Sequence, residues 1–261
     1  MKVMTTEQLI KKLTKAVNCK TLYIYSCFGA PMNTKNKQRY TNNCAYNKQP
    51  SRTAKINACS SDTFGFDCVN LIKGILWGWN ADINKTYGGA VYGSNGVPDT
   101  NANGMFHNNC YDKTTDFSNI IPGEFVWMEG HIGVYIGDNL VIECTPIWKD
   151  GVQITGLGNK GGKSGYNTRT WTQHGKSNFI EYPEAPTPSS FLPSRGYFKK
   201  GDSGDNVEKI CDFMSKQVRG NYYGDYAEAC IKVFQKQNGL EADGCIGPIT
   251  LNKMIEKGFK I

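Results

Sequence analysis

Hydrophobic and polar residues alternate in four short runs near the middle of the chain. These runs are EFVWMEG, HIGVYIG, NLVIECTP and GVQITGL, all within residues 124–157. A period of two, with many β-branched and aromatic residues, is typical of half-buried strands. Gly, Asp, Asn or Pro bound the runs, and the short connections favour pairing of consecutive strands. The pattern therefore predicts an antiparallel meander.

A period of three to four residues appears earlier in the chain. Thr5 and Gln8 are spaced as a capping box in front of an apolar stripe over 9–17, which predicts a helix. TLYIY (21–25) is expected to form a strand. Residues 30–60, rich in Asn, Lys, Thr and Tyr, are expected to form a long loop. A helix followed by a meander is typical of an α+β fold.

Residues 63–79, TFGFDCVNLIKGILWGW, predict a second helix. Their apolar residues recur at helical spacing: Val69, Ile72, Leu76 and Trp79. Asp67 stands at the first turn, where a carboxylate complements the helix dipole. Cys68 is therefore expected at the N-terminus of a helix.

A proline-rich segment divides the chain. Four prolines within residues 183–193 are incompatible with a helix interior or a central strand and favour extended polyproline geometry. We expect a catalytic-sized domain over residues 1–182, a linker over 183–196 and a small domain over 197–261. This last segment contains three helical patterns separated by Gly-Asp, Asp-Gly and Gly-Pro turns, which predicts an all-α, three-helix domain.

Composition narrows the class of protein. The chain has 261 residues, of which 39% are hydrophobic and 20% charged, as in an ordinary soluble protein. It has no apolar run of about 18 residues, so we expect no membrane insertion. Its start lacks a signal-peptide core, so we expect synthesis in the cytoplasm without a signal peptide. The ten cysteines include no CxxC pair, which predicts no metal site, and without an export signal we expect their thiols to be reduced.

The net charge of +7 lies mostly in the first 195 residues. A basic surface suits an anionic cell wall, nucleic acid or anionic lipid equally well, and a solvated face without a partner is as common. The charge therefore selects no partner by itself.

Cys68 is a candidate nucleophile. The free N–H groups and positive dipole at a helix N-terminus lower the pKa of a thiol and can also stabilise an oxyanion. The alternative is that Cys68 is a small buried core residue with a structural role only. His131 begins the strand HIGVYIG, and alternation places it with Gly133 on the face opposite the apolar one. We expect it to face a cleft or solvent, beside two glycines that leave room for a substrate.

The next strand supplies a carboxylate. If Gly137, Asp138 and Asn139 form a three-residue hairpin loop, Gly133 pairs with Glu143. His131 and Glu143 are then diagonal neighbours, and a carboxylate at that separation can reach an imidazole N–H. The alternative is that Glu143 is an outward-facing charge on an edge strand. Cysteine, histidine and carboxylate follow one another in papain-like order.

Two segments, FGFDCVNLI (64–72) and PGEFVWMEGHIGVYIGDNLVIECTP (122–146), resemble the NlpC-type papain-like peptidases of bacterial cell walls. The likeness implies a papain-like fold in which a helix bearing the cysteine packs on an antiparallel sheet. It also implies the following roles: Cys68 as nucleophile, His131 as base, Glu143 in the third position, Asp67 as a substrate-contacting or capping neighbour and Tyr25 near the oxyanion. Two departures are Val-Asn after the cysteine and a glutamate third residue, which also occurs in CHAP amidases and peptidases.

The C-terminal segment has a resemblance of its own. KKGDSGDNVEKI, YYGDYAEACIKVFQKQNGL and ADGCIGPITLNKM are similar to the three-helix peptidoglycan-binding domain, with its G-D-x-G, F-Q-x-x-x-G-L and D-G-x-x-G-x-x-T patterns. The alternative is a helical bundle used for dimerisation. The two likenesses together point to peptidoglycan as the partner.

The resemblances imply a modular peptidoglycan hydrolase, an endolysin or autolysin that reaches the wall after release. The expected bond is a stem-peptide amide between D-isoglutamate and a diamino acid, cut by a cysteine peptidase without cofactor or metal. An N-acetylmuramoyl-L-alanine amidase of CHAP type is one alternative. A non-catalytic wall-binding or phage tail protein is another. Nucleic acid is not expected as a partner.

Overall fold

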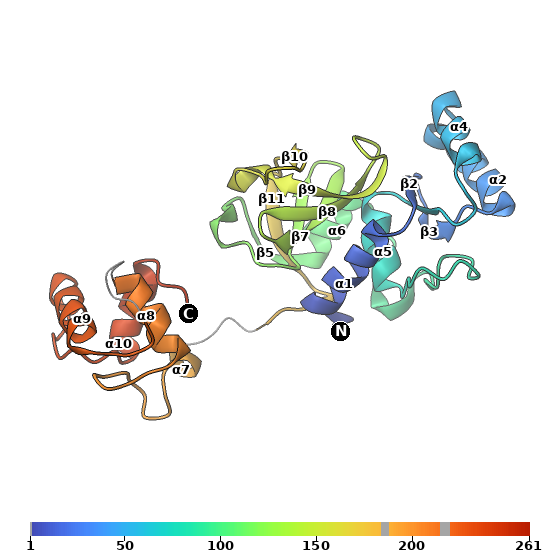
Figure 1. Ribbon diagram of the computed structural model, residues 1–261. Coiled ribbons are helices and arrows are strands. Elements are labelled where there is room, and N and C mark those ends of the chain that lie inside the picture. The colour runs from blue at the N-terminus through green and yellow to red at the C-terminus, as the bar shows by residue number, and fades with distance from the viewer. Residues whose placement is uncertain (1, 184–187, 215–219) are drawn as a thin grey trace. The chain divides into compact units, whose positions relative to one another are not determined.

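The computed structural model describes residues 2–183, 188–214 and 220–261. Two compact units divide it, Met1–Pro183 and Glu184–Ile261, each with its own hydrophobic core (Figure 1). Unit 1 is mixed α+β and unit 2 is helical, as predicted. Among the described residues, no helix is long and apolar enough to cross a membrane.

A seven-stranded sheet forms the centre of unit 1 and runs in the order β10-β9-β8-β7-β6-β11-β5. Its strands are β5 (Cys110–Thr114), β6 (Phe125–Met128), β7 (His131–Gly137), β8 (Leu140–Thr145), β9 (Gly151–Leu157), β10 (Thr168–Arg169) and β11 (Gln173–Ser177). Strands β6 to β9 pair antiparallel in sequence order, which confirms the predicted meander.

Two smaller pairings complete the strands of unit 1. A three-stranded sheet has the order β2-β4-β3, and β1 pairs with β12. These strands are β1 (Met4–Thr5), β2 (Thr21–Tyr23), β3 (Phe28–Pro31), β4 (Phe64–Phe66) and β12 (Ile180–Glu181). Strand β4 leads directly into the predicted cysteine helix, so it fixes where that helix begins.

Both faces of the large sheet are covered. Ile132 and Val134 of β7 belong to the main core, together with residues of α1 (Thr6–Val17), α5 (Cys68–Leu76) and α6 (Ala102–Asn109). Tyr135, from the same strand, belongs to a second apolar cluster with Val141 and Trp171. Alternate residues of β7 thus pack against two different apolar clusters, one on each face of the sheet. The capping box of Thr5 and Gln8 is also present at the start of α1.

Most of residues 30–60 form helices, so the prediction of a long loop there was wrong. The helices are α2 (Thr34–Asn43), α3 (Ala45–Lys48) and α4 (Pro50–Ala58). Figure 1 shows α2 and α4 beside β2 and β3, away from the large sheet. They bury few apolar side chains, among them Tyr40 and Ile56, while Asn36, Asn47 and Arg52 are buried polar residues. Such helices leave no apolar stripe in the sequence.

The described residues of unit 2 include the three expected helices and a short one before them. They are α7 (Pro188–Phe191), α8 (Asp205–Met214), α9 (Asp225–Gln237) and α10 (Pro248–Glu256). The unit 2 core includes Val207, Ile231 and Leu251.

The described part of unit 1 also contains short 3-10 helices, which are η1 (Ser94–Gly96), η2 (Phe117–Asn119) and η3 (Gly158–Lys160).

The predicted linker over 183–196 is too long. Phe191 and Leu192 are buried in the core of unit 2, and Phe191 packs edge-on against Phe198 and Phe259. Pro188 begins a helix, a position where its missing N–H costs nothing. Residues 184–187 of the predicted linker lie outside the described residues.

Candidate functional site

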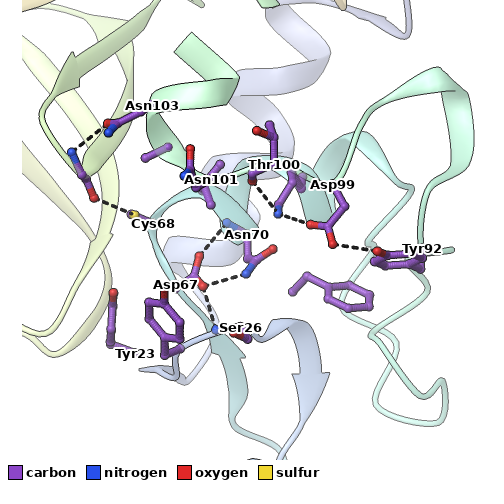
Figure 2. Close-up of a pocket in the computed structure, with 16 residues that line it drawn as sticks. Tyr23, Ser26, Asp67, Cys68, Asn70, Tyr92, Asp99, Thr100, Asn101 and Asn103 are labelled. Atoms are coloured by element: carbon purple, nitrogen blue, oxygen red, sulfur yellow. Dashed lines mark hydrogen bonds and ion pairs between the residues drawn. The ribbon is translucent and has the colours of Figure 1, made fainter. Parts of the chain in front are cut away.

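Cys68 is the first residue of α5, as the sequence predicted, and is 8% exposed. It lines a cavity of about 510 Å³ whose walls come from β2, the start of α5, the segment before α6 and the β6–β7 turn (Figure 2). Tyr23, Asn103 and Gly130 stand around the sulfur side of this cavity. The thiol therefore lines an opening large enough for part of a peptide.

Asp67 caps the helix that carries the cysteine. Its carboxylate accepts hydrogen bonds from the Asn70 N–H (2.8 Å), the Asn70 side-chain amide (2.6 Å) and the Ser26 N–H (2.8 Å). The residue is 5% exposed, and burial raises the pKa of its carboxyl group despite these donors. Asp67 thus fixes the backbone around the thiol, and Figure 2 shows its side chain at the cavity wall beside Cys68.

The pKa of Cys68 moves in the opposite direction to the one predicted. Burial, followed by the neighbouring Asp67 carboxylate, raises the pKa of the thiol to about 12. The backbone N–H groups of Val69 and Ile132 act in the lowering direction but do not overcome these effects. The helix terminus was identified correctly, while its desolvation could not be read from the sequence. Cys68 is consequently a thiol at neutral pH.

His131 and Glu143 lie together, as the sequence predicted. Nε2 of His131 is 2.6 Å from Oε2 of Glu143, and Gly133 pairs with Glu143 in the β7–β8 ladder. The hairpin loop, however, has two residues rather than three. Asp138 and Asn139 both have positive φ, at 50° and 57°, as in a type I′ turn. A register shift between Tyr135 and Gly137 restores the pairing at Gly133.

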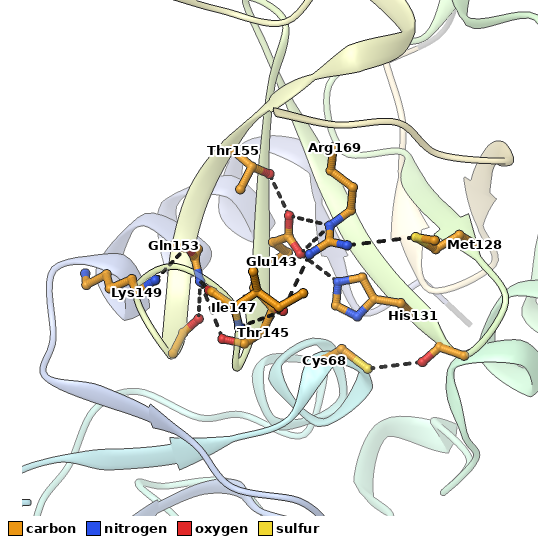
Figure 3. Close-up of polar contacts among 12 residues, drawn as sticks. Cys68, Met128, His131, Glu143, Thr145, Ile147, Lys149, Gln153, Thr155 and Arg169 are labelled. Carbon is orange, nitrogen blue, oxygen red and sulfur yellow. Dashed lines mark hydrogen bonds and ion pairs between the residues drawn. The ribbon is translucent and has the colours of Figure 1, made fainter. Parts of the chain in front are cut away.

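The imidazole lies between the carboxylate and the thiol. Figure 3 shows Nδ1 of His131 on the side of the ring that faces the Cys68 sulfur. This approach is possible because His131 is the first residue of β7, next to Gly130, whose carbonyl oxygen is 3.9 Å from the sulfur. Nδ1 makes no hydrogen bond to another described residue, so it is available to accept a proton.

Glu143 is fully buried and held by three partners from three strands. Nε of Arg169 on β10 donates to both carboxylate oxygens, at 3.0 and 2.9 Å, and Thr155 on β9 donates to Oε1 at 2.7 Å. Burial alone would raise the pKa of Glu143, but the contacts with His131 and Arg169 hold it below its ordinary value. Glu143 is therefore an anion at neutral pH, not an outward surface charge.

Sequence reasoning missed Arg169 and Trp171, because neither lies in a run with a clear period. Trp171 stacks on the His131 ring, with centroids 5.3 Å apart and planes 9° from parallel. A Cβ on Gly133 would lie 3.1 Å from the Trp171 ring. The space left by Gly133 is therefore taken by Trp171, which corrects the expectation that it leaves room for a substrate.

Tyr25 lines the cavity but its side chain is 49% exposed, and its backbone N–H bonds to the Asn47 side chain. Tyr23 is the more buried tyrosine. Burial and then Cys68 are the largest of the causes that raise its pKa, which places its hydroxyl in the electrostatic environment of the thiol. Tyr23, which the sequence did not single out, is thus a more buried tyrosine that lines the same cavity as Cys68.

The far side of the cavity carries a group of polar side chains. Lys73, on α5, contacts the Asp99 carboxylate at 2.5 Å and the Thr100 carbonyl at 2.8 Å, while the Tyr92 hydroxyl donates to Asp99 at 2.7 Å. The Lys73 side chain is 4% exposed and that of Asp99 is 47% exposed. Asp99 therefore presents a fixed carboxylate to the cavity.

The other two histidines lie outside this arrangement. His107 packs against Trp127, and His174 pairs through Nδ1 with the buried carboxylate of Glu124. Among the described residues, no group of three His, Cys, Asp or Glu side chains is arranged as metal ligands.

Comparison with known proteins concerns the helical unit. No curated protein matches the chain. Residues 211–254 match the family described as "putative peptidoglycan binding domain". The matched segment begins in α8 and ends in α10, so it covers the helical core of unit 2. It supports binding to peptidoglycan and a role for this protein at the bacterial cell wall.

Proposed function

We propose that this protein is a peptidoglycan hydrolase that cuts a stem-peptide amide through Cys68, His131 and Glu143. The observation that carries the proposal is the imidazole of His131, bonded to Glu143 at 2.6 Å on one side and facing Cys68 on the other. This is the arrangement of a nucleophile, a base and a group that orients the base. The peptidoglycan-binding match in the same chain supplies the substrate class.

The first half of the reaction begins from the thiol. Because Glu143 is ionised, the Nε2–H group of His131 donates a hydrogen bond to that carboxylate, and the unprotonated Nδ1 is the base. Nδ1 takes the Cys68 proton as the sulfur attacks the amide carbon, and the N–H groups at the start of α5 stabilise the oxyanion. His131 then protonates the leaving amine, the C–N bond breaks and a thioester remains on Cys68.

The second half regenerates the enzyme. Nδ1 of His131 removes a proton from water as the water oxygen attacks the thioester carbon. The C–S bond breaks, the proton returns to the sulfur, and a carboxylic acid leaves. Unit 2 contributes by holding the enzyme on an insoluble polymer, which raises the local substrate concentration without adding catalytic groups.

The bond proposed first is the amide between D-isoglutamate and the diamino acid, which comes from the resemblance to NlpC-type peptidases. One observation favours a second candidate, an N-acetylmuramoyl-L-alanine amidase. The third residue is a glutamate, as in CHAP enzymes, and it lies within hydrogen-bonding distance of the histidine. Both reactions use the same three side chains in the same steps.

Digestion of purified peptidoglycan tests the proposal. Mass spectrometry of the released fragments should show new amino groups, on the diamino acid for the peptidase and on alanine residues freed from muramic acid for the amidase. Cys68→Ala should release none and should still pellet with the walls, because nucleophile and binding domain lie in different units. Unchanged release of fragments by Cys68→Ala would contradict the cysteine mechanism, whereas wall binding by the wild type without release of any fragment would identify a non-catalytic wall-binding protein.

A further inference from the structure

Glu143 shares its carboxylate between a base and a permanent cation. Oε2 lies 2.6 Å from Nε2 of His131 and 2.9 Å from Nε of Arg169. The side chain of Glu143 is fully buried, and those of His131 and Arg169 are 15% and 14% exposed. Charges this close and this shielded from solvent interact strongly, so Arg169 must affect the proton equilibrium of His131.

The direction of that effect follows from charge. A buried carboxylate beside a neutral imidazole favours the imidazolium, because protonation creates an ion pair. An imidazolium cannot accept the proton of Cys68. Arg169 compensates the negative charge of Glu143 before His131 is protonated, and so reduces the advantage of the imidazolium.

The protein contains a histidine–glutamate pair for comparison. His174 contacts Glu124 through Nδ1 and the Asp116 carbonyl through Nε2. Among the described residues, no arginine or lysine contacts Glu124. Burial lowers the pKa of His174, but the contacts with Glu124 and Asp116 outweigh it and the pKa is raised. Glu124, together with Asp116, thus favours the charged form of His174.

We propose that Arg169 is a positioning residue that compensates the charge of Glu143 beside His131 and holds the Glu143 carboxylate next to Nε2. Its Nε donates to both oxygens of Glu143, so the carboxylate cannot rotate away from the imidazole without losing these contacts. Its guanidinium also lies over the Trp148 and Trp171 rings, at 5.0 and 5.6 Å from their centroids, which fixes the arginine in turn. The catalytic consequence rests on the proposed function, whereas the proton equilibrium does not.

The charged and titratable groups around the imidazole come from three elements. Glu143 faces it from β8, Arg169 approaches Glu143 from β10, and Cys68 faces the ring from α5. Burial keeps Cys68 protonated near neutral pH, so it adds no charge there. The balance around His131 is therefore set by Glu143 and Arg169.

The titration of His131 in the full-length protein, followed by NMR of the imidazole, tests the inference. In Arg169→Gln, the pH midpoint of His131 should rise by about one unit, because the compensating cation is gone. Arg169→Lys retains the charge and should keep the midpoint near that of the wild type. Should Arg169→Gln not fold, Arg169→Met is titrated with the same expectation.

A buried pair elsewhere serves as the matched control. Nη1 of Arg52 lies 2.9 and 2.7 Å from the two oxygens of Asp150, and Arg52 is 5% exposed. Arg52→Gln removes an equivalent ion pair and should leave the His131 midpoint unchanged even if it lowers the melting temperature. A folded Arg169→Gln with an unchanged midpoint would overturn the inference, as would a raised midpoint in Arg169→Lys equal to that in Arg169→Gln.

The kinetic consequence is separate from the titration. If the protein hydrolyses peptidoglycan, the acid limb of its pH–rate profile should move up in Arg169→Gln by the same amount as the His131 midpoint. If it hydrolyses nothing, the proposed function fails while the NMR result still decides the role of Arg169.

Discussion

The indole of Trp171 covers the imidazole of His131 almost in parallel, with 5.3 Å between ring centroids and 9° between planes. Trp171 is 3% exposed, so this stack shields one face of the imidazole from water. Within the described residues its Nε1 is buried without a hydrogen-bond partner. Trp171 therefore contacts His131 through the face of its ring, and its N–H group makes no hydrogen bond to another described residue.

Substitution of Trp171 separates these two properties. Trp171→Phe keeps an aromatic ring and removes an unpaired buried donor, so it should fold with near wild-type stability. Trp171→Ala removes the stack and leaves a cavity, and should destabilise unit 1 by about 3–5 kcal/mol. Chemical denaturation followed by circular dichroism measures both. Equal losses in the two variants would mean that the indole N–H has a role that the structure does not show.

Gly133 should be intolerant of any side chain for the same reason. A Cβ there would lie 2.9 Å from Cγ1 of Val141 and 3.1 Å from the Trp171 ring. Gly133→Ala should displace Trp171 and destabilise unit 1 by about 1–3 kcal/mol through overpacking. NMR should show the His131 ring protons losing the ring-current shift that Trp171 imposes. A Gly133→Ala protein with unchanged His131 shifts and stability would contradict this packing.

Alkylation reports the state of the Cys68 thiol. With its pKa raised to about 12, Cys68 should react slowly with iodoacetamide at pH 7, and the rate should rise about tenfold per pH unit up to pH 9. Asp67→Asn keeps an N-capping side chain but removes the nearby charge, so it should react faster at any given pH. Peptide mapping locates the label. Rapid, pH-independent labelling of the wild type near neutrality would show a resting thiolate.

The buried pair of His174 and Glu124 should make stability depend on pH. The pKa of His174 is raised in the folded state, so its contribution is present below the unfolded pKa of about 6.5 and is lost as pH rises through the folded value. Glu124→Gln removes the charge interaction. The stability gap between wild type and Glu124→Gln should therefore be wider at pH 6 than at pH 8.5.

Tryptophan fluorescence during urea unfolding measures this gap in unit 1. All five tryptophans, at positions 77, 79, 127, 148 and 171, lie before residue 183, so the signal excludes unit 2. A gap that widens as pH rises would show that His174 is neutral in the folded protein.

The sequence predicted the parts of the site that depend on periodicity. Alternation placed His131 and Glu143 on one face, and the pairing of Gly133 with Glu143 survived an error in the turn, because the irregularity near Ile136 offsets the shorter loop. The start of α5 was readable because Asp67 caps it. These features are local, so a few neighbouring residues determine them.

The remaining features depend on tertiary contacts. Arg169 lies 26 residues from Glu143 in the sequence, in a two-residue strand whose length gives no period. The raised pKa of Cys68 follows from burial by elements that pack around α5, and no single segment encodes it. Helices α2 to α4 are held largely by polar contacts, such as that of Arg52 with Asp150, which a hydrophobic pattern does not reveal.

The most direct test of the cysteine mechanism is the mass of the peptide that contains Cys68, measured during turnover. Wild-type protein is mixed with soluble stem-peptide fragments, quenched in acid within the first turnovers, digested and analysed by mass spectrometry. The cysteine mechanism predicts an acyl adduct on the peptide that contains Cys68, formed as free amine appears. Cys68→Ala should form neither the adduct nor the amine. Cys19→Ala, which removes a partly buried thiol outside the cavity lining, should behave as the wild type. Release of amine at the wild-type rate by Cys68→Ala, with no adduct on the wild-type peptide, would contradict the cysteine mechanism.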